Sequence, residues 1–145
     1  MKKNLFLHNG LLSFLIVLLL TQCKYTTTSQ KQAILNIPSD SLSYQLGRII
    51  VCKHIDITGK DIKAGGQIST ELDISMINSK DLPSDRNNQN ELAKKIATII
   101  KNALQNKNDF DSYKVFFITE TKSENAMGTI TKKNYISFDF KKVEI

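Results

Sequence analysis

The stretch Gln67–Asn78, which reads QISTELDISMIN, has the most regular pattern of the chain and decides the expected fold. Every second position from Ile68 to Met76 carries isoleucine, threonine, leucine or methionine, and the positions between them carry serine or an acid. A period of two places the first set on the buried face of a strand and the second set on the face that meets water. The stretch therefore predicts a strand in a sheet that is covered on one side only.

The segment after this strand, residues 82–108, predicts a helix that lies across the sheet. Its apolar residues recur at helical spacing and form one stripe: Leu92, Ile96, Ile99, Ile100 and Ala103. Asn88, with Glu91 three residues later, forms a variant of the capping box and predicts the start of the helix.

Two further strands are expected near the C-terminal end. Tyr113–Thr121 has apolar residues on both faces, which is typical of an interior strand. Asn134–Lys142 alternates, with Ile136, Phe138 and Phe140 expected to face inward. The stretch between them, SENAMG, supplies turn residues, so the two strands are predicted to pair as an antiparallel hairpin.

The segment before the first strand, Ser39–Lys53, predicts a helix that begins with Ser39 or Asp40 as N-cap, since its leucines and isoleucines follow helical spacing. A strand over Ile49–Ile57 is the competing interpretation, because β-branched residues dominate there. Two glycine-containing stretches are expected to be turns: Thr58–Lys60 and Gly65–Gly66. The order helix–strand–helix–strand–strand predicts an α+β domain whose antiparallel or mixed sheet has about three strands, covered by one or two helices.

The 145-residue length fits one domain plus a leader, and the formal net charge is +6. The basic excess lies before Gly65, whereas a nucleic-acid-binding domain concentrates basic residues on its folded face. We therefore expect no nucleic-acid partner. The aromatic residues of the last two strands are expected to pack in the core rather than to stack on RNA bases: Phe116, Phe117, Tyr135, Phe138 and Phe140.

The N-terminal end has the pattern of a secretory signal. Lys2 and Lys3 precede an apolar stretch, Leu11–Leu20, that is broken only by Ser13. This stretch is about half of the roughly 20 residues that a transmembrane helix needs. A cleaved leader is therefore favoured over a permanent membrane-spanning helix.

The leader ends in Leu20-Thr21-Gln22-Cys23, which resembles the lipobox of bacterial lipoprotein precursors, with Gln22 standing where a small residue is usual. The resemblance implies removal of residues 1–22 and attachment of lipid to Cys23, including palmitate-type acyl chains, so that the partner of this residue is a membrane. No acid follows Cys23 directly, which favours an outer-membrane protein that faces the periplasm. The polar residues 23–38 are predicted to be a flexible tether and residues 39–145 the domain; an edge strand made by the threonine run Thr26–Thr28 is the alternative for part of the tether.

Cys52, His54 and Asp56 are the only cluster of reactive side-chain types, and they would share one face of a strand. A zinc site needs four ligands, or three and a water, and no second Cys or His pair follows Cys23. The acids Asp109 and Asp111 are predicted to lie in a solvated turn. No residue set specifies a reaction, so we expect no catalytic residue, metal or cofactor.

The function expected from the sequence is that of a lipid-anchored cell-envelope protein whose domain binds an envelope protein and is not an enzyme. The alternative is a secreted or periplasmic module that binds a small molecule or a metal through Cys52, His54 and Asp56.

Overall fold

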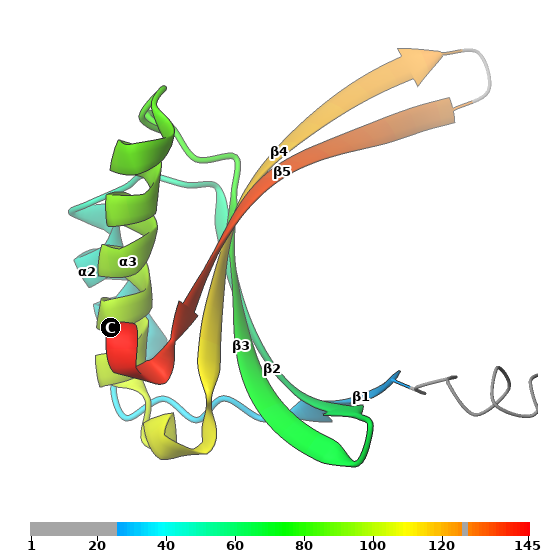
Figure 1. Cartoon of the computed structure of the whole chain (residues 1–145). Coiled ribbons are helices and arrows are strands. Elements are labelled where there is room, and N and C mark those ends of the chain that lie inside the picture. The colour runs from blue at the N-terminus through cyan, green and yellow to red at the C-terminus, as the bar shows by residue number, and fades with distance from the viewer. Residues whose placement is uncertain (1–25, 126–127) are drawn as a thin grey trace, which may run out of the picture.

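The computed structural model describes residues 26–125 and 128–145, with five strands and two α-helices (Figure 1). The elements, in chain order, are β1 (Thr26–Lys31), α2 (Ser39–Gly47), β2 (His54–Ala64), β3 (Gln67–Ile77), α3 (Arg86–Ala103), β4 (Ser112–Asn125) and β5 (Gly128–Lys141). Short 3-10 helices, η1 (Lys107–Asp109) and η2 (Lys142–Glu144), precede β4 and follow β5. The strands form one sheet in the order β1-β2-β3-β4-β5.

The sheet is mixed, because one of its four pairings is parallel. β3 and β4 run in the same direction, with Leu72 opposite Tyr113, and α3 makes the crossover between them. The other neighbours are antiparallel. Both α-helices lie on the same side of the sheet, so the opposite side is left open (Figure 1).

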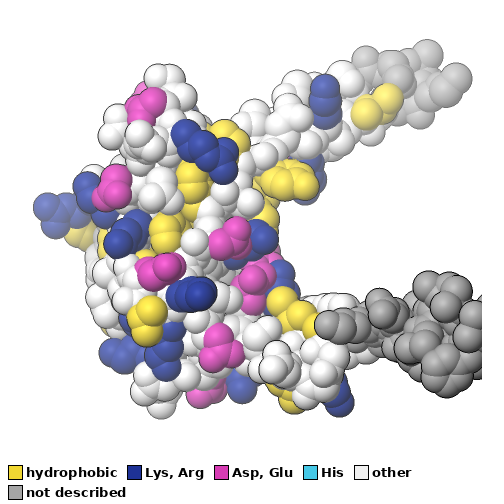
Figure 2. Space-filling model, in the orientation of Figure 1, with side chains coloured by type: hydrophobic (Ala, Val, Ile, Leu, Met, Phe, Trp, Pro, Cys, Tyr) yellow, Lys and Arg dark blue, Asp and Glu magenta, His cyan; other side chains and the backbone are white. Residues whose placement is uncertain are grey.

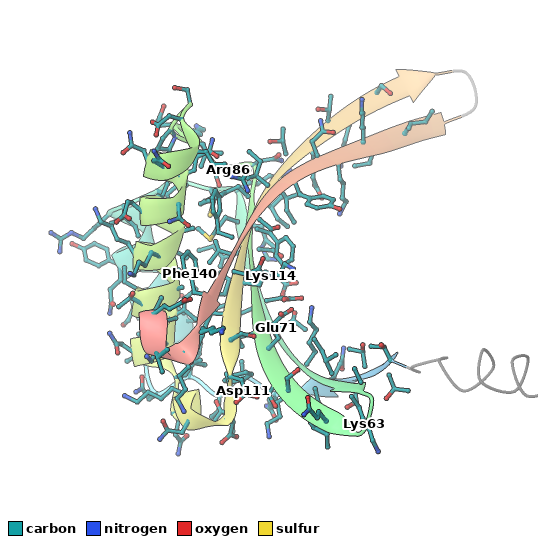
Figure 3. All side chains as sticks on the ribbon, viewed as in Figure 1. Lys63, Glu71, Arg86, Asp111, Lys114 and Phe140 are labelled. Atoms are coloured by element: carbon teal, nitrogen blue, oxygen red, sulfur yellow. The ribbon has the colours of Figure 1, made fainter. Side chains whose placement is uncertain are left out.

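The hydrophobic core lies between the helices and the covered face of the sheet. Leu72, Ile74 and Met76 of β3 are fully buried there, as are Ile96 and Ile100 of α3. Figure 3 shows Phe140 of β5 pointing toward the helices, whereas Glu71 and Lys114 lie on the open side. From Thr70 to Ile77, β3 therefore has one buried face and one face in contact with water, as predicted, whereas Ile68, which was also expected to be buried, is 65% exposed.

The general α+β class is confirmed, but the expectation of about three strands is wrong. Residues 26–31, expected to be part of a flexible tether, form the edge strand β1, which pairs with β2 from Thr26–Ala64 to Lys31–Gly59. The strand has no apolar face, and main-chain pairing with β2 holds it in the sheet. The alternative interpretation of the threonine run is therefore the correct one.

The other missed strand is β2, which includes the expected turn Thr58–Lys60. Gly59 is buried in the middle of this strand, and a Cβ placed on it would lie 2.8 Å from the ring of Phe110 and would also meet the carbonyl oxygen of Lys31. Glycine is thus required for the close approach of β1 and Phe110, not for a change of chain direction. The second expected turn is confirmed, since Gly65 and Gly66 both have positive φ and join β2 to β3.

The helix boundaries also differ from the predictions. α2 ends at Gly47 rather than near Lys53, and its N-cap is Pro38 rather than Ser39 or Asp40. α3 begins at Arg86, where the side chain of Asp85 accepts a hydrogen bond of 2.9 Å from the backbone of Asn88. The side chain of Asp85, and not that of Asn88, therefore satisfies one of the free N–H groups in the first turn of α3.

The C-terminal hairpin is confirmed and is longer than predicted. Its register runs from Ser112–Lys141 to Asn125–Gly128, and β4 is an interior strand between β3 and β5. Beyond Ile118, the last residue of β4 that pairs with β3, the two strands project from the body as a two-stranded arm (Figure 1). No helix within residues 26–125 and 128–145 is long and apolar enough to span a membrane. Cys23 and the leader lie outside the described residues.

Candidate binding face of the sheet

The open face of the sheet, defined as the side away from the helices, is built from the alternate residues of β2 to β5. Lys60 of β2 lies opposite Glu71 of β3, and its Nζ atom lies 2.8 Å from Glu71 Oε1 and 2.6 Å from Asp73 Oδ2. Glu71 and Asp73 are two residues apart on one strand, so their side chains project to the same side. The three half-buried groups form one charged cluster at the centre of this face.

The two carboxyl groups of this cluster have pKa values that are shifted in opposite directions. Burial, the largest influence, raises the pKa of Asp73; the nearby Glu71 raises it further, and the hydrogen bond from Lys60 opposes the rise. Burial also disfavours the charged form of Glu71, but hydrogen bonds from Lys60 and Asp73 outweigh it and lower the pKa of Glu71. Asp73 is therefore the member of the pair that takes up a proton first.

The pKa of Lys60 is shifted by the same two carboxyl groups. Burial disfavours its charged form, but the hydrogen bonds to Asp73 and Glu71 outweigh that influence and raise the pKa of Lys60. Among the described residues, Asp73 Oδ1 is the one buried side-chain oxygen or nitrogen atom without a hydrogen-bond partner. Lys60 therefore leaves one carboxylate oxygen of the cluster, Asp73 Oδ1, without a hydrogen-bond donor.

A second group of side chains on the open face joins β4 to β5. Lys114 Nζ lies 3.2 Å from Asp139 Oδ1 and 5.5 Å from the ring centroid of Phe116. The Phe116 ring meets the ring of Tyr135 edge-on, with centroids 6.4 Å apart. Aromatic rings at this distance and angle attract one another through their quadrupoles. The result is an aromatic pair beside charged side chains that are already matched.

A shallow hollow of about 300 Å³ joins the two groups. Its lining residues are Asp73, Ser75, Phe116, Ile118 and Tyr135. Tyr135 is 70% exposed, so it stands above the surface as one wall of the hollow. Figure 2 shows the molecule hollowed between the projecting β4–β5 arm and the opposite end of the sheet, with acidic and basic side chains side by side between them.

These positions correct one prediction from the sequence. Phe117, Phe138 and Phe140 are buried in the core as expected, but Phe116 and Tyr135 lie on the open face. The alternation of β4 could have predicted the position of Phe116. Tyr113, Val115 and Phe117 face the core, so Phe116, which lies between two of them, must face the opposite side of the sheet. The alternation is not evident in the sequence, because Val115–Ile118 is apolar at every position.

The cluster of Cys52, His54 and Asp56 is not brought together as a ligand set. Cys52 precedes β2 and packs against the core, and burial raises the pKa of its thiol. His54 and Asp56 lie exposed on β2, where Asp56 accepts a long hydrogen bond of 3.5 Å from Thr58. In the part of the chain that the structure describes, no three Cys, His, Asp or Glu side chains are placed to hold a metal ion.

Cys52 and His54 do line another hollow, of about 390 Å³, between the end of α2 and the start of β2. Asp56 does not line it. The hollow therefore contains two of the three residues expected to bind a small molecule or a metal in the alternative hypothesis. Burial keeps the Cys52 side chain in its neutral thiol form.

Asp109 and Asp111 have structural contacts rather than a shared site. Asp111 Oδ2 accepts a hydrogen bond of 2.8 Å from the backbone N–H of Thr70, which ties the start of β4 to β3. Asp109 lies in η1 and pairs with Lys31 of β1 at 3.5 Å. Asp111 thus braces the sheet, which the prediction of a solvated turn did not anticipate.

No protein-family model, curated protein or solved structure matches this chain.

Proposed function

We propose that this chain is a lipid-anchored cell-envelope protein, held at the outer membrane on its periplasmic side by lipid on Cys23. Its domain binds another envelope protein and is not an enzyme. The leader and the tetrapeptide Leu20–Cys23 support the anchor. The observation that carries the binding role is the aromatic pair of half-buried Phe116 and exposed Tyr135 on a sheet face that the helices leave uncovered.

The charges of the open face favour a protein partner over a highly charged ligand. Lys60 is matched by Glu71 and Asp73, Lys114 by Asp139, and Lys133 by Glu120 at 2.7 Å. Matched charges leave little net field to attract a polyanion or a polycation. Aromatic anchors surrounded by polar groups are instead the usual composition of protein–protein interfaces.

The hollow beside Tyr135 has the size for one side chain of a partner. At about 300 Å³ it is at the lower limit of ligand pockets, and it is open rather than enclosed. An apolar side chain placed there would contact Phe116 and Ile118 while its backbone remained at the surface. A protein can supply such a side chain together with contacts to the projecting arm.

The anchor is tested by intact mass of the chain extracted from bacterial membranes, with Cys23→Ala as the control. We expect a chain that begins at Cys23 and is heavier by two or three acyl groups. An unmodified mass would refute the anchor and leave the binding role of the open face to be tested alone.

The binding role is tested by replacing Tyr135 with a photo-crosslinking amino acid in living cells. Tyr44 of α2 is the matched control, because it is also a tyrosine and is 72% exposed against 70% for Tyr135. We expect a discrete crosslinked band, the same in repeated preparations, from position 135 and none from position 44. Equal crosslinking from both positions would contradict a specific binding face.

A further inference from the structure

The β2–β3 tip, residues 63–69, lies beside the start of β1, the strand that follows the proposed lipid anchor in the chain. β1 begins at Thr26, which pairs directly with Ala64 at the end of β2. Cys23 is three residues before Thr26, so their Cα atoms are at most about 11 Å apart. Adjacent strands are about 5 Å apart, so the anchor lies within roughly 16 Å of Ala64, the residue that precedes the turn at Gly65–Gly66.

This short connection limits how far the domain can stand from a bilayer. If residues 26–31 were a free tether, the domain would be separated from Cys23 by many more residues. Because these residues are instead β1, the sheet itself begins three residues after the anchor. The polar interface on each side of a bilayer is about 5–7 Å thick, so the tip lies within reach of the headgroups.

The side chains of the β2–β3 tip suit such a surface. All seven residues from Lys63 to Ser69 are exposed, and Ile68 is 65% exposed although it lies on the same side of the sheet as the core. Lys63 is directly opposite Ile68 across the two strands, so a basic group and an apolar group point the same way. Ile68 is not among the described residues that pack against the core, so core packing does not account for an isoleucine at this position.

The charge of this region has one sign. Between Ile62 and Thr70 the chain has one lysine and no acid, and between Cys23 and Gln30 it has one lysine, Lys24, and no acid. The nearest carboxyl groups, Asp61 and Glu71, are set back from the turn and have partners, since Asp61 accepts from the Thr70 hydroxyl and Glu71 from Lys60. Basic residues beside an exposed apolar residue are attracted to anionic headgroups.

We infer that the β2–β3 tip docks on the anionic lipid surface that holds the anchor, with Ile68 entering the interface and Lys63 contacting headgroups. The inference rests on the proposed lipidation of Cys23. The docked tip would hold the domain at a fixed orientation, with α2 directed away from the lipid surface. Figure 1 shows β1 beginning at the same end of the sheet as the turn between β2 and β3, and the helices on the far side.

The absence of tryptophan from the sequence makes this contact measurable. Ile68→Trp places a single indole at the tip, and Tyr44→Trp places one on α2 at similar exposure. Each full-length variant is extracted from membranes, its acylation is established by intact mass, and it is reconstituted in phosphatidylglycerol-containing vesicles with brominated acyl chains.

We expect the brominated lipid to reduce the emission of I68W by about half and to leave that of Y44W unchanged. Acylated I68W whose emission is not quenched would overturn the docking of the tip while leaving the anchor intact. Equal quenching of both variants would also overturn it, because no preferred orientation would exist. Chains without acyl groups would overturn the anchor itself and, with it, this inference.

Discussion

On β3, Leu72, Ile74 and Met76 are fully buried beneath the helices, whereas the residues between them face the open side of the sheet. The buried set contributes through close packing, which depends on volume and barely on pH. Glu71 and Asp73, on the open side, contribute through charge, which depends on their protonation. One strand thus has one face that stabilises the domain by packing and another that leaves polar groups available for contacts.

The largest effect should come from the buried face. Ile74→Ala removes a fully buried side chain and should lower the free energy of unfolding by about 2–5 kcal/mol, because a cavity remains. The adjacent Ser75→Ala, on the open face, should change it by less than about 0.5 kcal/mol. Urea unfolding followed by circular dichroism measures both. Equal losses would mean that the two faces of β3 contribute in the same way.

Close packing on the covered side can also be tested by adding one carbon. Gly59→Ala should lower the free energy of unfolding by about 1–3 kcal/mol, since its Cβ would meet Phe110 and the Lys31 carbonyl. Gly47→Ala is the matched control, because nothing lies within 4 Å of a Cβ at the last position of α2. That change should be neutral or slightly stabilising. A neutral Gly59→Ala would show that β1 is not held closely against β2.

These two positions also show which features the sequence could predict. The alternation of β3 and the stripe of α3 indicate their elements directly, because both bury one continuous face. The sequence predicts a turn at Gly59, but glycine is needed there because Lys31 of β1, 28 residues earlier in the chain, leaves no room for a Cβ. Such a requirement arises from tertiary packing and has no local signal.

The candidate binding face was not predicted because its residues come from different strands. Lys60, Asp73 and Tyr135 meet through the strand order and register, which the missed β2 concealed. The cluster that was noticed, around Cys52 and His54, owed its prominence to nearness in sequence. Cys52 and His54 line one hollow but Asp56 does not, so the fold does not bring the three side chains together as a ligand set.

The open face should respond to pH where the covered face does not. Lys60→Met removes the cation between Glu71 and Asp73 and should cost about 1–2 kcal/mol at pH 7, because two half-buried carboxylates then lose the cation that both contact. Without Lys60, the pKa values of both carboxyls should rise above their unfolded values. Their favourable contribution would then be present at low pH and would be lost as pH rises through the folded pKa values.

The wild type has the opposite dependence at Glu71. Because its pKa is lowered in the folded state, its contribution is present above the unfolded pKa and is lost as pH falls through the folded pKa. Asp73, whose pKa is raised, works in the other direction and weakens the folded state as it ionises. Unfolding measured from pH 4 to pH 7 should therefore show a deficit of Lys60→Met that grows with pH. A deficit independent of pH would indicate lost packing rather than lost charge.

The smallest effect on stability should come from Tyr135, where the effect on binding should be largest. Tyr135→Ser removes a mostly exposed ring and should change the free energy of unfolding by less than about 0.5 kcal/mol, as should Tyr44→Ser. Only Tyr135→Ser should also reduce recovery of the partner that is crosslinked from Ile118, since both residues line one hollow. Stability is measured by urea unfolding, and recovery by the yield of the crosslinked band. A loss of yield with both serine variants would indicate a general change in the protein. No loss with either variant would show that Tyr135 is not part of the binding face, and Phe116 would remain as the aromatic contact of that face.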